Sequence, residues 1–196
     1  MNSNKLQAKD FINIGIFTAL QFVVEFACAM LGFIHPYFVA ALTILIPIVG
    51  AIPMMLFYTK IEKFGMLTIM SVLLAIIMFV TGMGYLGAPL IILAGVIADL
   101  IAKSGGYKSS KKTVISYAIF SLWVCANYFP VIITADSYRQ DLLDGGYSAE
   151  YCDNLFGVVN SKTIAILVLV CFLCGIIGAL IGKAIVRKHF EKAGIA

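Results

Sequence analysis

Glu25 is one of the few residues in this sequence that could do chemistry inside a long apolar segment. Gln21 precedes it by one helical turn, so both side chains would share a helix face. A carboxyl group inside an apolar helix is costly and usually faces a cavity or a polar partner. Two interpretations stay open: Glu25 is a structural group bonded to a neighbouring helix, or it lines a ligand cavity.

A second candidate group follows one face of a helix expected over residues 113–134. Its members recur every three or four residues and are Ser116, Phe120, Trp123, Asn127, Pro130 and Thr134. Aromatic rings offer apolar contact area and an amide offers oriented hydrogen bonds, which together suit a small organic ligand. Core packing combined with an aromatic belt at the membrane interface is the alternative.

The sequence lacks the motifs of common catalytic and nucleotide-binding sites. The segment from Gly178 to Ala184 resembles a phosphate-binding loop, but it has one residue too few between its glycines and no Ser or Thr after Lys183. Four of the five cysteines fall in apolar runs, with no disulfide or zinc-ligand spacing. We therefore expect no enzyme activity, no cofactor and no metal.

The composition defines the surroundings in which these residues must act. The chain has 196 residues, of which 62% are hydrophobic and 12% charged, and its mean hydropathy is +1.02. Soluble domains are about half apolar and about a quarter charged. These values predict an all-α membrane protein with one integral membrane domain, 1–196, and exclude a secreted disulfide scaffold and a nucleic-acid partner.

Six apolar segments approach the roughly 20 residues that a membrane-spanning helix needs. They cover about 11–34, 37–58, 65–81, 85–102, 113–134 and 161–186. Pro47 and Pro53 could kink or break the second segment. We expect a compact bundle of six transmembrane helices.

The basic residues predict the orientation of this bundle. With the N-terminus in the cytoplasm, every Lys and Arg except Arg139 and Lys162 falls on the cytoplasmic side. Both termini are then cytoplasmic, and the protein is a multi-pass protein of the cell membrane. The acidic stretch 135–160 becomes an outer loop, either a solvated connector or a lid over an outward-facing cavity.

Small residues form two faces along which another helix could approach closely. Gly15 and Ala19 are four residues apart in the first segment, and the last segment carries Gly175, Gly178, Ala179 and Gly182. Small residues allow close helix packing in lipid. These faces could pack within the bundle or dock another membrane subunit.

The six-helix plan, the Gly15/Ala19 pair and the acidic outer loop resemble the substrate-binding S component of an energy-coupling factor (ECF) transporter. The tail, Gly175–Lys183 followed by Lys188–Ile195, resembles the Trep-Strep (MptD-like) branch of that group. Gly15 stands where the family motif A-x-x-x-A begins with Ala.

This resemblance implies a role that composition alone does not. S components of ABC-type importers capture a vitamin or other micronutrient outside the cell, and they dock onto a transmembrane coupling subunit driven by two ATPase subunits. By this resemblance the ligand would contact Trp123, Asn127, Tyr128, Asn160 and Lys162, with Glu25 and Tyr85 as further candidates. Docking would use the first-helix pair.

Two other classes of function remain as alternatives. An autonomous ion-coupled secondary transporter or channel needs a proton or ion relay, and a single carboxyl group, that of Glu25, is weak support for one. The segments also show no obvious inverted repeat. An intramembrane enzyme needs paired catalytic groups at one depth, and the sequence shows no such pair.

Overall fold

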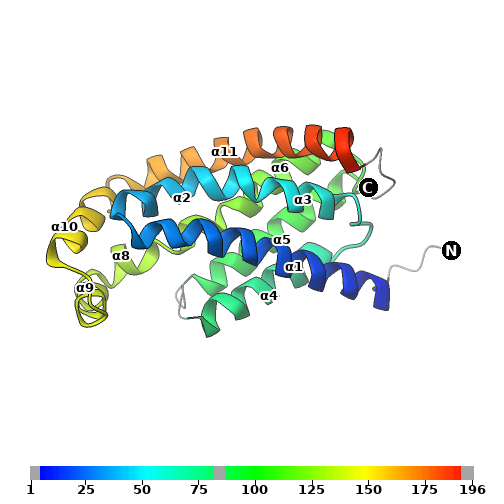
Figure 1. The fold of residues 1–196 in the computed structure, drawn as a ribbon. Helices are drawn as coiled ribbons and strands as arrows, with labels where there is room; N and C mark the ends of the chain where they lie inside the picture. Colours follow the sequence, from blue (N-terminus) through cyan, green and yellow to red (C-terminus); the bar gives the residue numbers. More distant parts are fainter. Residues whose placement is uncertain (1–4, 82–86, 191–196) are drawn as a thin grey trace.

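The computed structural model describes residues 5–81 and 87–190, and these residues form a bundle of helices (Figure 1). In chain order the elements are α1 (Ala8–Ala29), η1 (Met30–Phe33), α2 (Pro36–Val49), α3 (Ala51–Tyr58), α4 (Met66–Val80), α5 (Ala88–Ser104), α6 (Ser110–Ser121), α7 (Trp123–Ala126), α8 (Phe129–Ile133), α9 (Ala135–Asp144), α10 (Ala149–Val158), α11 (Ile164–Ile185) and η2 (Val186–Phe190).

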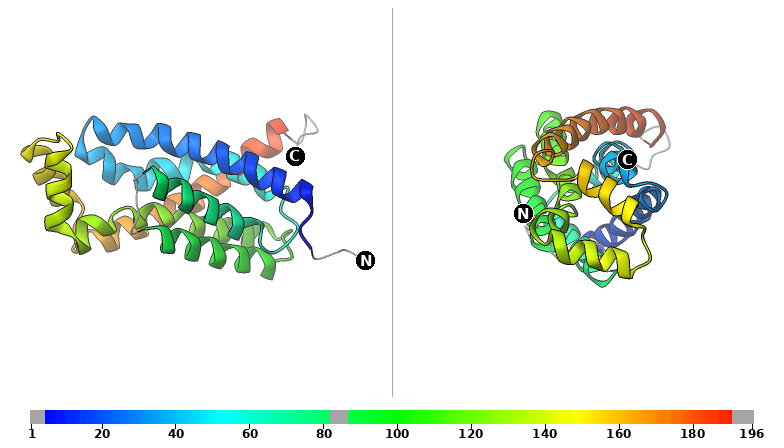
Figure 2. Two further views of the ribbon diagram at one scale, coloured as in Figure 1. Left: turned by 90° about the horizontal axis from the view of Figure 1, so that it is seen from below. Right: turned by 90° about the vertical axis from the view of Figure 1, so that its left-hand side faces the viewer.

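Grouped by continuity, the described helices make six rods along the long axis of the bundle. The rods are α1 with η1, α2 with α3, α4, α5, α6 to α8, and α11 with η2. We call the end at which α1 begins and α11 finishes the base end. The opposite end, where α9 and α10 lie across the rods, is the lid end (Figure 2). The rods match the predicted segments to within a few residues, although residues 82–86, including Tyr85, lie outside the described part of the chain.

Three of these rods are long and apolar enough to cross a membrane by themselves: Ala8–Phe33, Pro36–Tyr58 and Ile164–His189. The helix Met66–Val80 is apolar but shorter. The all-α membrane class is therefore supported by several candidate spans, while six crossings with cytoplasmic termini stay a prediction.

The outward faces of the rods carry large apolar side chains, as a lipid-facing surface would. Ile16, Leu20 and Val23 of α1 are about half exposed, and so are Leu169 and Leu180 of α11. An apolar belt of this extent is unusual on a soluble monomer, where large exposed apolar patches mark interaction sites. Contact with lipid hydrocarbon would cover this apolar belt without another protein.

The second and fifth predicted helices are not continuous. The break between α2 and α3 at Gly50 agrees with the expected effect of the prolines, because Pro53 has no N–H to donate to the carbonyl of Val49, the last residue of α2. The predicted helix 113–134 is instead divided into α6, α7 and α8, with interruptions at Leu122 and at Asn127–Tyr128. The expectation of one uninterrupted fifth helix was therefore wrong.

Asp99 is fully buried on α5 and holds the start of α4 in place. Its Oδ2 accepts hydrogen bonds from the backbone N–H groups of Gly65 (2.9 Å) and Thr68 (3.1 Å) and from the Thr68 hydroxyl. Its Oδ1 accepts from the Tyr107 hydroxyl. A carboxylate at a helix N-terminus satisfies donors that have no partner within the helix. Asp99 therefore has a structural role at the start of α4.

The small residues of α11 lie inside the bundle, against α2, α3 and α6. A Cβ added at Gly182 would lie 2.7 Å from the carbonyl oxygen of Ala51, and one added at Gly178 would overlap the carbonyl of Pro47. Gly175 and Ala179 share this inward face. Of the two roles expected for these four residues, docking a partner subunit or packing within the bundle, the structure favours packing within the bundle.

Candidate functional site

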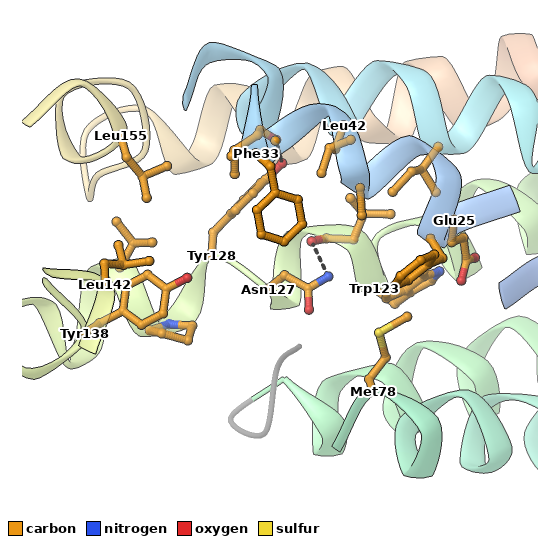
Figure 3. Close-up of a pocket in the computed structure, with 18 of the residues that line it drawn as sticks. Glu25, Phe33, Leu42, Met78, Trp123, Asn127, Tyr128, Tyr138, Leu142 and Leu155 are labelled. Carbon is orange, nitrogen blue, oxygen red and sulfur yellow. Dashed lines mark hydrogen bonds between the residues drawn. The ribbon is translucent and has the colours of Figure 1, made fainter. Parts of the chain in front are cut away.

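A cavity of about 270 Å³ opens between the rods at the lid end (Figure 3). Its wall takes residues from α1, η1, α2, α4, the α7–α8 segment, α9 and α10. In the close-up, Glu25 lies at one end of the cavity beside Trp123, and Tyr138, Leu142 and Leu155 lie at the other. Elements that are far apart in the sequence, from α1 to α10, therefore converge on one cavity.

Most of this wall is aromatic or aliphatic. The rings that line it are those of Phe22, Phe26, Phe33, Trp123, Tyr128, Tyr138, Tyr147 and Tyr151. The aliphatic part includes Val39, Leu42, Ile46, Val131, Leu142 and Leu155. A mainly apolar wall with a few oriented polar groups is typical of sites that bind small organic molecules.

The interrupted rod α6–α8 supplies the central part of the wall. The backbone N–H groups of Leu122, Cys125 and Tyr128 each donate to the carbonyl three residues earlier, so the chain tightens in this region. Pro130, on the first turn of α8, cannot donate to the preceding turn. The result places Trp123, Asn127 and Pro130 on the cavity. The other three residues of the same predicted face do not line it: Ser116, Phe120 and Thr134.

Tyr128 fixes this segment against α2. Its hydroxyl donates a 2.8 Å hydrogen bond to the carbonyl oxygen of Val39, and its ring is almost completely buried. Asn127 donates from its amide nitrogen to the carbonyl of Val124, 3.3 Å away, which orients the side chain. The buried oxygen Oδ1 of Asn127 has no hydrogen-bond partner.

Glu25 and Gln21 form a buried polar pair on α1, each with 1% of its surface exposed. Gln21 donates from Nε2 to Oε1 of Glu25 over 2.6 Å, as their one-turn spacing suggested. The second carboxyl oxygen of Glu25, Oε2, is buried without a hydrogen-bond partner, as is Oε1 of Gln21. Buried polar atoms left without a partner are few in native proteins and call for an explanation. A ligand in the cavity that forms hydrogen bonds with Glu25 and Asn127 would explain their unpaired atoms.

The predicted outer loop 135–160 folds into α9 and α10, and both helices close over the cavity. The backbone N–H of Tyr151 donates to the Ser148 hydroxyl, which caps the start of α10. A 2.7 Å ion pair between Arg139 and Asp153 joins the two helices. Because five residues of this stretch line the cavity, the arrangement favours the interpretation of the segment as a lid.

The structure brings together four of the seven predicted ligand residues, Glu25, Trp123, Asn127 and Tyr128. Their role in binding stays a prediction.

Asn160 and Lys162 do not line the cavity. The side chain of Asn160 accepts from the backbone N–H groups of Lys162 (2.9 Å) and Thr163 (3.2 Å), which shapes the turn before α11. Lys162 is exposed.

The Gly15/Ala19 face of α1 points away from the bundle. Both residues are exposed, and a Cβ added at Gly15 would meet no atom within 4 Å. Glu25 and Gln21 lie on the inward face of the same helix. One helix therefore offers an open surface outward and a cavity wall inward.

Several lining residues were not among the sequence-predicted site. They include Phe22, Phe26 and Phe33 from the first rod and Met78 from α4. The spacing of Phe22, Phe26 and Glu25 on one helix was a usable signal, since residues three and four apart share a face. Nothing in the local sequence of Met78 distinguishes it from the apolar residues around it.

The candidate spans, the apolar outer surface and the cavity at one end define an integral membrane protein. The sequence profile of the Trep_Strep family, described as hypothetical bacterial integral membrane proteins, matches residues 8–192. The chain therefore belongs to this family and is a bacterial integral membrane protein. It matches no curated protein and no solved structure.

Proposed function

We propose that this protein is the substrate-binding S component of an ECF-type importer and captures a small organic micronutrient. The observation that carries the proposal is the lidded, aromatic-walled cavity at the lid end, opposite the base end, where most of the basic residues lie. Its volume is close to the lower end of the range for small-molecule sites, about 300 Å³. A vitamin-sized molecule fits that scale.

In such importers, ligand binding and ATP hydrolysis belong to separate subunits, and this sequence is consistent with the ligand-binding one. The sequence contains no nucleotide-binding motif of the Walker type, so uphill transport would need energy from elsewhere. In this proposal a coupling subunit and two ATPase subunits supply it, and the chain itself catalyses no reaction. The exposed Gly15/Ala19 face supports docking, because small residues let another helix approach closely.

An autonomous ion-coupled transporter fits these observations less well. It would need a series of exchangeable groups, and the buried carboxyl groups of the described residues are those of Glu25 and Asp99. Asp99 is occupied as the cap of α4. Glu25 alone makes no relay.

Co-expression tests the proposal directly. The tagged protein is produced with and without the coupling and ATPase subunits of the same bacterium, and each preparation is reconstituted into liposomes. We expect a stable complex and ATP-dependent uptake only with all subunits present. Mass spectrometry of the purified protein identifies the molecule whose uptake is followed. Uptake by the isolated chain, or failure to copurify with the other subunits, would contradict the proposal.

A further inference from the structure

The charge of the cavity ligand can be inferred from which side chains line the site and which do not. Glu25 contributes a carboxyl group, whereas no Lys, Arg or His is among the described residues of the wall. The basic residues Lys108, Lys183 and Arg187 instead line a separate cavity at the base end. An anionic ligand at the lid end would therefore face a carboxyl group and no counter-charge.

Three hydrogen-bond donors of the described wall are used within the protein. The Tyr128 hydroxyl donates to the Val39 carbonyl, and the Tyr151 hydroxyl donates over 2.6 Å to the Gly32 carbonyl. The amide nitrogen of Asn127 donates to Val124. These bonds hold the wall together, and they occupy both hydroxyl hydrogens and one of the two amide hydrogens of Asn127.

Two hydrogen-bond acceptors of wall residues, in contrast, have no partner within the described protein. Oε2 of Glu25 and Oδ1 of Asn127 are buried without a hydrogen-bond partner, and both residues line the cavity. A buried polar group without a partner is destabilising, so a ligand that donates a hydrogen bond to each of these two atoms would be bound favourably. The surrounding rings add a preference for a flat or cationic group, because aromatic faces attract cations.

We propose that the ligand is a ring-bearing organic cation or a neutral N–H donor, such as a protonated amine or a protonated nitrogen heterocycle, and not a carboxylate or a phosphate. Glu25 accepts from its charged N–H group, Asn127 accepts from a second donor, and the aromatic wall contacts its ring. This inference rests on the proposed function, since it names the substrate class of the same cavity.

The single tryptophan of the chain makes the test direct, because Trp123 lies in the cavity wall. Its fluorescence is titrated with three probes of similar skeleton: phenethylamine, 3-phenylpropionamide and 3-phenylpropionate. The phenyl ring of each probe leaves the tryptophan signal readable. We expect the amine to bind about tenfold or more tightly than the carboxylate, a ratio equivalent to about 1.4 kcal/mol, with the amide between them.

Glu25→Gln removes the ionisable carboxyl group and keeps the shape of the side chain. We expect this variant to lose the preference for phenethylamine over 3-phenylpropionate while still binding the neutral amide. Glu62→Gln, the same change on an exposed residue near the base end, should behave like the unmodified protein. Asn127→Asp provides a second variant, which should increase the preference for the amine. Unfolding temperatures confirm that each variant is folded.

Three results would overturn the inference: the carboxylate binds as tightly as the amine, Glu25→Gln leaves the preference unchanged, or phenethylamine does not bind up to its solubility limit. These outcomes are independent of the proposed function. Assembly with the coupling subunits is measured by copurification and does not depend on the charge of the ligand. If this protein assembles with the coupling subunits but prefers the carboxylate probe, the proposed ligand class is refuted and the proposed function is not.

Discussion

The hydroxyl of Tyr151 donates a 2.6 Å hydrogen bond to the carbonyl oxygen of Gly32, a residue 119 positions earlier in the chain. Tyr151 belongs to the lid helix α10 and Gly32 to η1 at the end of the first rod. Burial raises the pKa of Tyr151 to about 12, so the hydroxyl keeps its proton at neutral pH and remains a donor. This bond is a direct polar link between the lid and the bundle.

Tyr151→Phe removes this link and leaves the ring in place. A typical buried hydrogen bond contributes about 1 kcal/mol, so we expect the amides of α10 to exchange with solvent about fivefold faster. Hydrogen exchange followed by mass spectrometry measures the effect. Tyr37→Phe, a change on an exposed residue outside the cavity, is the control. Unaltered exchange in α10 would show that the bond does not hold the lid.

Gly15→Leu combined with Ala19→Leu fills the open face of α1. We expect ATP-dependent uptake to be abolished, because the larger side chains prevent close approach of the coupling subunit, while ligand affinity stays within about twofold. Uptake into liposomes and a binding titration separate the two effects. Ala165→Leu, on the exposed side of α11, is a matched control for added apolar bulk. If uptake survives the double change, the docking assignment is wrong.

Asn127→Ala should weaken binding by about 1–3 kcal/mol, because it removes a buried acceptor from the cavity. The affinity is measured for the molecule that copurifies, or for phenethylamine where none does. Lys162→Ala should leave the affinity unchanged, since Lys162 is exposed and does not line the cavity. The pair of variants distinguishes ligand residues that the structure gathers from those that only the resemblance suggested. Equal effects from the two changes would contradict this distinction.

Gly182→Ala should destabilise the bundle by about 1–3 kcal/mol through overpacking, because the added methyl group would press on the Ala51 carbonyl and the Met55 side chain. Gly157→Ala provides the contrast, as a Cβ there meets no atom within 4 Å and alanine favours the helix. Thermal unfolding of both variants in the same detergent gives the comparison. Equal stability of the two would mean that α11 can shift without cost.

The sequence was most informative where polar residues interrupt apolar runs. Glu25 and Asn127 were identified because a carboxyl or an amide in an apolar helix is costly unless it has a partner or faces a cavity. Both line the observed cavity. Hydrophobic length likewise indicated the positions of the rods.

The sequence was less informative about apolar residues, because lipid and protein interior favour the same side chains. Met78 faces the cavity whereas Ile76 faces outward, and their chemistry does not separate them. The small residues of α11 posed a similar problem, since close packing within a chain and docking between chains require the same residue types. Asn160 was ambiguous because asparagine is suited to turns as well as to binding.

The interruption of the rod α6–α8 also determines where specificity can change. Irregular backbone at membrane depth is tolerated only inside protein or along a wet cavity, and the residues from Trp123 to Ala126 are all buried. The path of the main chain, more than the identity of any one ring, therefore keeps this wall turned inward. Other side chains on the same path would change the shape and polarity of the cavity and leave the scaffold unchanged.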